Sequence, residues 1–321
     1  MKVLVTGGTG FIGQALLRRM QADGLYRLRV AVRSPNASLP DEADMILVVG
    51  LSPQADWQAA VAGVDMIVHT AARVHVMRDQ ANDPLEEYRR VNVSGMLCLA
   101  RQAAEAGVRR FVYISSIKVN GEQTPPGQPF RADDRAAPED AYGISKMEAE
   151  QGLLALARET GLEVVIIRPP LVYGPGVKGN FAVMMRWVEK GVPLPLGAIR
   201  HNRRSLVALD NLVDLIMTCM EHPAAANEVF LAGDGNDLST AELLRKLARA
   251  MDRPARLIPV PQGVLEAALK ALGKGELAKR LCGSLQVDIS KARDLLGWEP
   301  KVSVDEGLRC TVEPFLAEKS G

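Results

Sequence analysis

The first thirteen residues constrain the fold of this chain more than any other stretch. A short apolar run, Lys2–Thr6, has the composition of a β-strand, and helical composition begins at Gln14. The turn between them fits both G-x-G-x-x-G and the looser G-x-x-G-x-x-G through four glycines: Gly7, Gly8, Gly10 and Gly13. A strand, a glycine turn and a helix start form a phosphate cradle, because backbone N–H groups and the helix dipole face the anion. We therefore predict a dinucleotide site here that includes Phe11 and Ile12.

The composition excludes several classes of protein. The chain has 321 residues and a formal net charge of +1, so no strong field predicts nucleic acid or an anionic membrane as a partner. Without a signal peptide or an apolar run of about 18 residues, we expect a cytoplasmic protein with no membrane insertion. The four cysteines show no paired spacing. The four histidines, His69, His75, His201 and His222, show no ligand spacing, and His69 is a candidate core residue. We therefore expect no metal site.

The order of predicted elements indicates an α/β fold. Apolar strands alternate with helices in the first half of the chain, which predicts a Rossmann-type, doubly wound parallel sheet over residues 1–169. The predicted strands are Lys2–Thr6, Arg27–Val32, Met45–Val49, Val64–Thr70, Arg110–Ser115 and Glu163–Arg168. The predicted helices are Gln14–Asp23, Ser52–Ala62, Asp83–Glu105 and Ala141–Thr160.

Regular alternation ends near Pro169. We expect residues 170–321 to form mainly a smaller α/β substrate-binding lobe, with some later segments returning to the main sheet. Short strands are predicted at Arg203–Val207 and Glu228–Ala232, and helices at Phe181–Lys190, Asp210–Glu221, Thr240–Met251, Val264–Leu281 and Ser290–Leu296. Val172–Gly179 has the composition of a loop.

Ligands in such sheets lie beyond the carboxyl ends of the strands. The residues that follow the predicted strands, and that we expect to touch the cofactor, include Ala71, Ala72 and Pro169. Arg33 ends the second strand, twenty residues after Gly13, where an acid would suit NAD and an arginine suits a 2′-phosphate. NADP(H) is therefore the preferred cofactor, NAD(H) is possible, and a solvated loop arginine is the alternative reading of Arg33.

Two motifs carry candidate chemistry. Tyr142 and Lys146 stand at i and i+4, which places them on one face of a helix. A nearby ammonium favours the phenolate, so we expect Lys146 to lower the pKa of Tyr142 toward neutrality. Ser116 follows the fifth strand and offers a hydroxyl to a substrate oxygen, unless it is an ordinary turn hydroxyl.

Together these motifs resemble the extended short-chain dehydrogenases/reductases, in the branch of nucleotide-sugar epimerases, dehydratases and reductases. The resemblance covers essentially the whole chain and rests on Thr6–Gly13, Ser115-Ser116, Tyr142-x-x-x-Lys146 and Arg168–Gly176. Within this branch, four segments are most similar to bacterial UDP-N-acetylquinovosamine dehydrogenases: Ala72–Asp79, Ser115–Glu122, Pro170–Lys178 and Arg204–Asn211.

The resemblance implies a role for each candidate. Tyr142 would be the general acid at the sugar O4, Lys146 would tune it and hold the nicotinamide ribose, and Ser116 would bond the same oxygen. Asn92 would support the site, and Asn180 and Arg204 would hold the nucleotide diphosphate, although Asn180 could instead cap a helix. The family also implies a homodimer through two long helices.

Two departures from the family pattern affect the substrate. No acid follows the third strand, and no arginine lies between Cys282 and Asp288, where many relatives hold the diphosphate; Arg280 is the nearest substitute. The main hypothesis is an NAD(P)H-dependent C4 reduction of a UDP-4-keto-6-deoxy-N-acetylhexosamine for surface-polysaccharide (O-antigen) synthesis. The alternatives are a UDP-sugar 4-epimerase with bound NAD and, more distantly, a non-catalytic NADP-sensing regulator.

Overall fold

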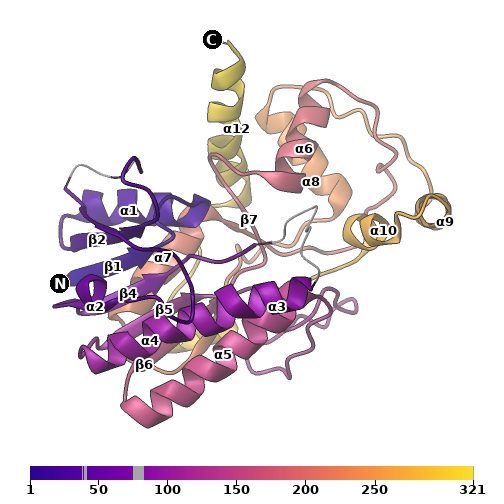
Figure 1. Ribbon diagram of the computed structural model, residues 1–321. Helices are drawn as coiled ribbons and strands as arrows, with labels where there is room; N and C mark the ends of the chain where they lie inside the picture. Colours follow the sequence, from indigo (N-terminus) through magenta and orange to yellow (C-terminus); the bar gives the residue numbers. More distant parts are fainter. Residues whose placement is uncertain (38, 40–41, 75–82, 321) are drawn as a thin grey trace.

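The structure, a computed structural model, describes residues 1–37, 39, 42–74 and 83–320. Its centre is a parallel seven-stranded sheet in the order β3-β2-β1-β4-β5-β6-β9 (Figure 1). The strands span Lys2–Thr6 (β1), Arg27–Val32 (β2), Asp44–Leu47 (β3), Met66–His69 (β4), Arg110–Ile114 (β5), Glu163–Arg168 (β6) and Val229–Leu231 (β9). The chain winds outward from β1 and then from β4, so the switch point, where such sheets bind ligands, lies between these two strands. This confirms the predicted Rossmann-type fold.

Helices cover both faces of the sheet, because alternate side chains of each strand point to opposite sides. Val3 and Val5 join one core and Leu4 joins the other. The first face packs against α1 (Phe11–Asp23), α7 (Leu209–Glu221) and α11 (Ser290–Leu296). The second face packs against α2 (Gln58–Val61), α4 (Met96–Glu105) and α5 (Ala141–Thr160).

Most of the elements beyond residue 169 form a second group with its own core, which contains Tyr173, Phe181 and Leu244. Figure 1 shows its helices apart from the sheet, on the side opposite the N-terminus. The group comprises β7 (Leu171–Tyr173), β8 (Leu206–Ala208), α6 (Gly179–Glu189), α8 (Thr240–Ala250), α9 (Gln262–Ala271), α10 (Gly275–Cys282) and α12 (Val304–Ser320). Three elements beyond residue 169, namely α7, β9 and α11, pack on the main sheet instead.

Several elements differ from the sequence-based expectation. The helix predicted over Ser52–Ala62 is only α2, because the Asp56 carboxylate accepts a hydrogen bond from the Gln58 N–H and starts the helix there. The helix predicted over Asp83–Glu105 is three segments: α3 (Pro84–Tyr88), a wider π-helical stretch (Arg89–Gly95) and α4.

Three more differences lie in the second half. Part of the predicted loop Val172–Gly179 is strand β7, which pairs with β8. A left-handed turn at Gly273 divides the helix predicted over Val264–Leu281 into α9 and α10. Helix α12 was not predicted; it contains Pro314, a residue that normally marks a helix end.

Candidate active site

The glycine turn packs so closely that side chains would not fit at three positions. A Cβ on Gly7 would lie 2.6 Å from the Ala71 amide nitrogen, one on Gly8 2.5 Å from Val30 Cγ1, and one on Gly13 2.2 Å from the Gly7 carbonyl oxygen. Helix α1 begins at Phe11, and no side chain caps it, which leaves its first N–H groups to face a ligand. This cradle fits the diphosphate of a dinucleotide.

The predicted cofactor contacts gather along the carboxyl edge of the sheet. Ala71 and Ala72 follow β4 and are half-buried, and Ala71 lies directly against Gly7. Pro169 follows β6, is buried, and accepts a hydrogen bond from the Ile117 N–H at 3.0 Å. Ala71 therefore flanks the glycine turn, whereas Pro169 lies farther along the same edge, beyond β5.

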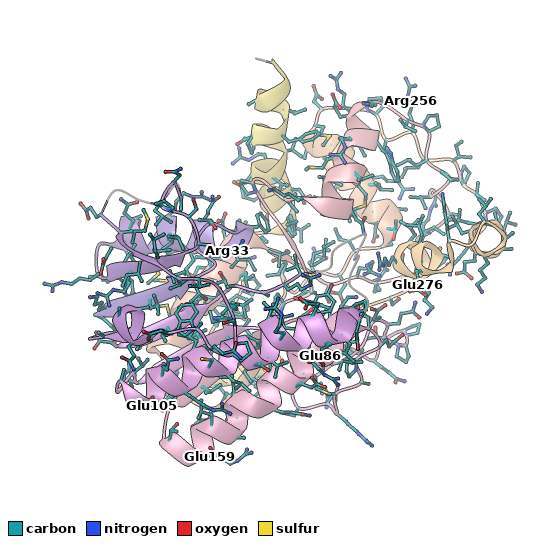
Figure 2. All side chains as sticks on the ribbon, viewed as in Figure 1. Arg33, Glu86, Glu105, Glu159, Arg256 and Glu276 are labelled. Carbon is teal, nitrogen blue, oxygen red and sulfur yellow. The ribbon has the colours of Figure 1, made fainter. Side chains whose placement is uncertain are left out.

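Arg33 is exposed and follows β2 directly, next to the glycine turn on the sheet (Figure 2). Its Cδ lies 3.6 Å from the position of a Cβ on Gly50, so the side chain lies over the loop that follows β3. Among the described residues, Arg33 has no ion pair with a carboxylate. Its guanidinium is placed at the end of the strand where the adenine ribose of a dinucleotide binds in this fold.

Asn92 connects two parts of the site from the π-helical stretch. It is buried, and its amide oxygen accepts from the Arg73 N–H at 2.8 Å while its amide nitrogen donates to the Arg73 carbonyl at 3.1 Å. The same nitrogen also donates to Ser145 Oγ at 3.1 Å. Asn92 thus fixes the chain after β4 against the helix that carries Lys146, and π-helical turns are frequent at functional sites.

Tyr142 and Lys146 lie on the first two turns of α5, whose N-cap is Asp140. The Asp140 carboxylate accepts from the Gly143 N–H at 2.7 Å. Lys146 Nζ lies 5.9 Å from the centre of the Tyr142 ring, and Tyr88 meets the same ring edge-on. The spacing prediction that these two side chains share a face is confirmed.

Lys146 is fully buried, which shapes its chemistry. Its ammonium donates to the Ile114 carbonyl at 2.8 Å and lies 4.5 Å from the centre of the Tyr113 ring. Burial lowers the pKa of Lys146 from 10.5 to about 7, and the nearby Glu150 opposes this shift. Lys146 can therefore change protonation near neutral pH.

The expected lowering of the Tyr142 pKa is wrong for this structure. Burial raises the pKa of the Tyr142 phenol, and the Asp140 carboxylate and Tyr88 add to the rise. Lys146 does not offset these effects, and its ammonium donates to the Ile114 carbonyl instead. Tyr142 is therefore a neutral proton donor at neutral pH.

Ser116 is half-exposed at the end of β5, and its hydroxyl accepts from the Lys118 N–H at 3.3 Å. This bond caps the short helix Ile117–Val119, so Ser116 also has the role of an ordinary turn hydroxyl, the alternative considered from the sequence. A hydroxyl that accepts one weak bond still has a proton to donate to a ligand.

The predicted diphosphate contacts lie in the second group of elements. Arg204 is half-buried before β8, and its Nη1 donates to the Gly283 carbonyl at 3.2 Å. Burial lowers the pKa of Arg204, and the positive charge of Arg280 lowers it further, so the two guanidinium groups are close in space. Asn180 is the exposed second residue of α6, where Lys178 is the N-cap, so the helix-cap reading of Asn180 is wrong.

Comparison with known proteins identifies the family. Residues 3–233 match the model of the NAD dependent epimerase/dehydratase family. The chain belongs to this family. It is 49% identical over 314 residues to a UDP-glucose 4-epimerase of Vibrio cholerae, covering 98% of this chain and 95% of that protein. A UDP-glucose 4-epimerase of Mycolicibacterium smegmatis is 30% identical and covers both chains completely.

Solved structures agree with this assignment. The crystal structure of UDP-glucose 4-epimerase from Thermotoga maritima with UDP-glucose is 26% identical, with a TM-score of 0.77 over 99% of this chain and all of that one. This chain is therefore an NAD-dependent enzyme of the extended short-chain dehydrogenase/reductase type, and it belongs with the nucleotide-sugar epimerases.

A buried network next to the site was not predicted. Arg168, at the end of β6, donates through Nε and Nη2 to the Glu150 carboxylate, with the shortest bond at 2.6 Å, and through Nη1 to Asn120 Oδ1 at 3.0 Å. Ser115 donates to the same carboxylate. The network fixes the ends of β5 and β6 against α5. The i, i+4 spacing of Lys146 and Glu150 indicates that Glu150 lies on the same helix face as Lys146. The sequence does not identify Arg168 as the partner of Glu150.

Three of the four histidines, His69, His201 and His222, lie among the described residues. His69 is buried in β4 and accepts or donates one bond at 2.8 Å to Thr6, as expected of a core residue. Within the described residues no cluster of His, Cys, Asp or Glu has the arrangement of a metal site. His75 and most of Ala72–Asp79 lie outside those residues. In the part of the chain that the structure describes, no helix is both long and apolar enough to span a membrane.

Proposed function

We propose that this enzyme is a UDP-sugar 4-epimerase that inverts the C4 hydroxyl of a sugar such as UDP-glucose or UDP-N-acetylglucosamine. The observation that carries the proposal is the placement of the Tyr142 phenol beside buried Lys146 at the edge that carries the dinucleotide cradle. The 49% identity to a protein named UDP-glucose 4-epimerase favours this reaction over the reduction that the four similar segments predict.

The residues have distinct tasks in this proposal. Tyr142 exchanges a proton with the sugar O4: its phenolate accepts the proton when C4 is oxidised, and the resulting phenol returns it when C4 is reduced. Since burial and Asp140 disfavour the phenolate, the positive charges of Lys146 and of a bound nicotinamide would have to favour it. Ser116 hydrogen-bonds the same oxygen. Lys146 holds the nicotinamide ribose and, with a pKa of about 7, supplies a nearby positive charge that varies with pH. Gly7, Gly10, Phe11, Ile12 and Gly13 hold the dinucleotide, with Ala71, Ala72 and Pro169 beside it and Asn92 behind. NAD, when bound, supplies the hydride acceptor that C4 inversion requires.

The UDP diphosphate has a built candidate site at Arg204 and Arg280. Burial and the charge of Arg280 lower the pKa of Arg204, and an anion between the two guanidinium groups would relieve their repulsion. Their planar donors match phosphate oxygens. Arg280 then replaces the later arginine that is absent between Cys282 and Asp288, and Asn180 adds an exposed amide. In this proposal Arg204, Arg280 and Asn180 together hold the diphosphate.

The C4 reductase remains the second candidate, because Arg33 favours a 2′-phosphate and a reductase consumes NADPH. The deciding experiment supplies the purified enzyme with UDP-glucose or UDP-N-acetylglucosamine and, separately, with a UDP-4-keto-6-deoxy-N-acetylhexosamine and NADPH. Formation of the C4 epimer without net loss of NADPH supports the epimerase. Stoichiometric NADPH loss with the keto sugar and no epimer product would replace it with the reductase.

Three further features stay proposals. We propose NADP(H) as a cofactor alongside NAD(H), a homodimer formed through the long helices α4 and α5, and action in the cytoplasm. The sequence resemblance supports the dimer, and light scattering of the purified protein would test it. A mass of one protomer at micromolar concentration would contradict the dimer.

A further inference from the structure

Lys118 joins the strand end that carries Ser116 to the helix that carries Tyr142. It lies two residues after Ser116, in the short helix Ile117–Val119. Its ammonium donates to Glu122 Oε1 at 2.7 Å and also to the carboxylate of Asp140. All three side chains are 30% exposed or less, so water screens these ion pairs less than it would on an open surface.

Asp140 makes this ion pair part of the helix start. One oxygen of its carboxylate meets Lys118, and the other accepts from the Gly143 N–H in the first turn of α5. An N-cap carboxylate fixes where a helix begins and which way its first residues point. Ala141 and Tyr142 are the two residues between the cap and the capped N–H of Gly143.

The backbones of the two segments also touch. A Cβ on Gly143 would lie 2.9 Å from the Lys118 carbonyl oxygen, so the first turn of α5 packs directly on the Lys118 peptide. The Lys118 N–H, in turn, donates to Ser116 Oγ. One residue therefore contacts the Ser116 hydroxyl through its N–H, the Tyr142 turn through its carbonyl, and the cap of that turn through its ammonium.

We propose that Lys118 is a positioning residue that sets the Tyr142 phenol relative to the Ser116 hydroxyl and balances the charge of Asp140 beside the phenol. This inference rests on the proposed role of Tyr142 in proton transfer. Lys118 itself does not exchange a proton with the sugar; it acts through Asp140 and the first turn of α5.

The charged groups around Tyr142 predict the direction in which the pH profile of activity shifts when the Lys118 charge is removed. Tyr88 of α3, Tyr113 of β5, and Asp140 and Lys146 at α5 face the phenol, and Asp140 is the anion that raises its pKa. Without the Lys118 cation, the Asp140 charge is less balanced and the phenolate becomes less favourable still. The low-pH limb of activity, where Tyr142 must accept a proton, then moves to higher pH.

The test compares Lys118→Met and Lys118→Arg with Lys291→Met as the matched control. Lys291 also joins two carboxylates, Asp133 at 2.7 Å and Glu228 at 2.8 Å, with 22% exposure, but it touches neither Ser116 nor α5. For Lys118→Met we expect kcat to fall roughly 10–100-fold with little change in KM. We also expect its low-pH limb to rise by about half a pH unit. Lys118→Arg should keep most of kcat, and Lys291→Met should match the wild type.

A second variant and a second readout separate the charge effect from misfolding. Lys118→Met combined with Asp140→Asn keeps a capping side chain but removes the unbalanced charge, so its low-pH limb should return toward that of the wild type. Hydrogen exchange of peptides covering residues 141–147 should accelerate in Lys118→Met and not in Lys291→Met, whatever sugar the enzyme uses.

Some results would overturn the inference. These are wild-type kcat and pH profile in Lys118→Met, equal defects in Lys118→Arg and Lys118→Met, or unchanged exchange at the start of α5. If the wild type epimerised no UDP-sugar, the proposed function would fail, and the exchange measurement would still decide whether Lys118 fixes the helix start.

Discussion

Burial, rather than spacing, sets the protonation of the two residues that α5 brings together. Lys146 is surrounded by the β5 backbone and the Tyr113 ring, and its pKa falls to about 7. Burial, with Asp140 and Tyr88, raises the pKa of Tyr142. The i, i+4 spacing predicted the pair but not these directions, because a spacing carries no information about solvent or about a capping carboxylate.

Tyr142→Phe tests the proton-transfer role directly. We expect kcat to fall by roughly 10²–10⁴, the usual contribution of a positioned acid or base, while cofactor affinity stays close to that of the wild type. Tyr26→Phe is the matched control, since it removes a phenol that donates to Glu221 far from the site. Turnover of Tyr142→Phe equal to that of Tyr26→Phe would remove Tyr142 from the mechanism.

Arg33→Asp tests the cofactor prediction. An acid at the end of β2 repels a 2′-phosphate and accepts bonds from ribose hydroxyls, so NADPH should lose affinity by at least tenfold more than NADH does. The measurement is fluorescence titration of both cofactors, with Arg27→Asp at the opposite end of β2 as the control. Equal changes for both cofactors would show that Arg33 does not contact the 2′-phosphate.

The lowered pKa of Lys146 predicts how stability depends on pH. Between about pH 7 and its ordinary value of 10.5, the unfolded chain binds more protons at this lysine than the folded chain does. The free energy of unfolding of the wild type therefore gains from this residue as pH rises through that window, and the full penalty of burying the ammonium applies below pH 7.

Lys146→Met removes that dependence. The difference in unfolding free energy, variant minus wild type, should fall by roughly 1–3 kcal/mol between pH 7 and about pH 9.5. Urea unfolding at both pH values measures it, with Lys246→Met, at the exposed ion pair with Asp305, as the control. A difference that stays constant or grows with pH would contradict the lowered pKa.

At the scale of elements, the sheet was more predictable than the helices. Strands such as the one predicted over Val64–Thr70 were easy to recognise in the sequence, because a strand buried on both faces is largely a run of apolar residues. Helix boundaries were set instead by single side chains, including the Asp56 turn before α2 and Gly273 between α9 and α10. The Glu150–Arg168 pair lay beyond prediction, since its partners come from different elements.

Gly13→Ala tests the junction of β1 and α1. Its new Cβ would lie 2.2 Å from the Gly7 carbonyl oxygen, and backbone cannot move aside cheaply, so we expect a loss of about 1–3 kcal/mol in unfolding free energy and weaker cofactor binding. Gly263→Ala in α9 is the control, because its Cβ would meet nothing within 4 Å. Wild-type stability and cofactor affinity in Gly13→Ala would contradict the close packing of the turn.

At the scale of the whole molecule, each half of the chain supplies residues to the substrate site that we propose. The main sheet supplies Ser116 and Tyr142, and the second group supplies Arg204 and Arg280. The motif predicted Arg204, but its closeness to Arg280 depends on how α10 folds back beside the chain before β8. Sequence spacing does not encode that tertiary contact.

This arrangement predicts that UDP alone stabilises the enzyme. An anion between two guanidinium groups relieves their repulsion, so UDP at about 100 times its Kd should add about 2.7 kcal/mol to the unfolding free energy and raise Tm by a few degrees. Arg204→Met and Arg280→Met should each remove most of that rise. Arg253→Met, an exposed arginine of the same group, should keep it. A UDP-induced rise that survives in both Arg204→Met and Arg280→Met would place the diphosphate elsewhere, and a rise lost in only one would assign it to that arginine alone.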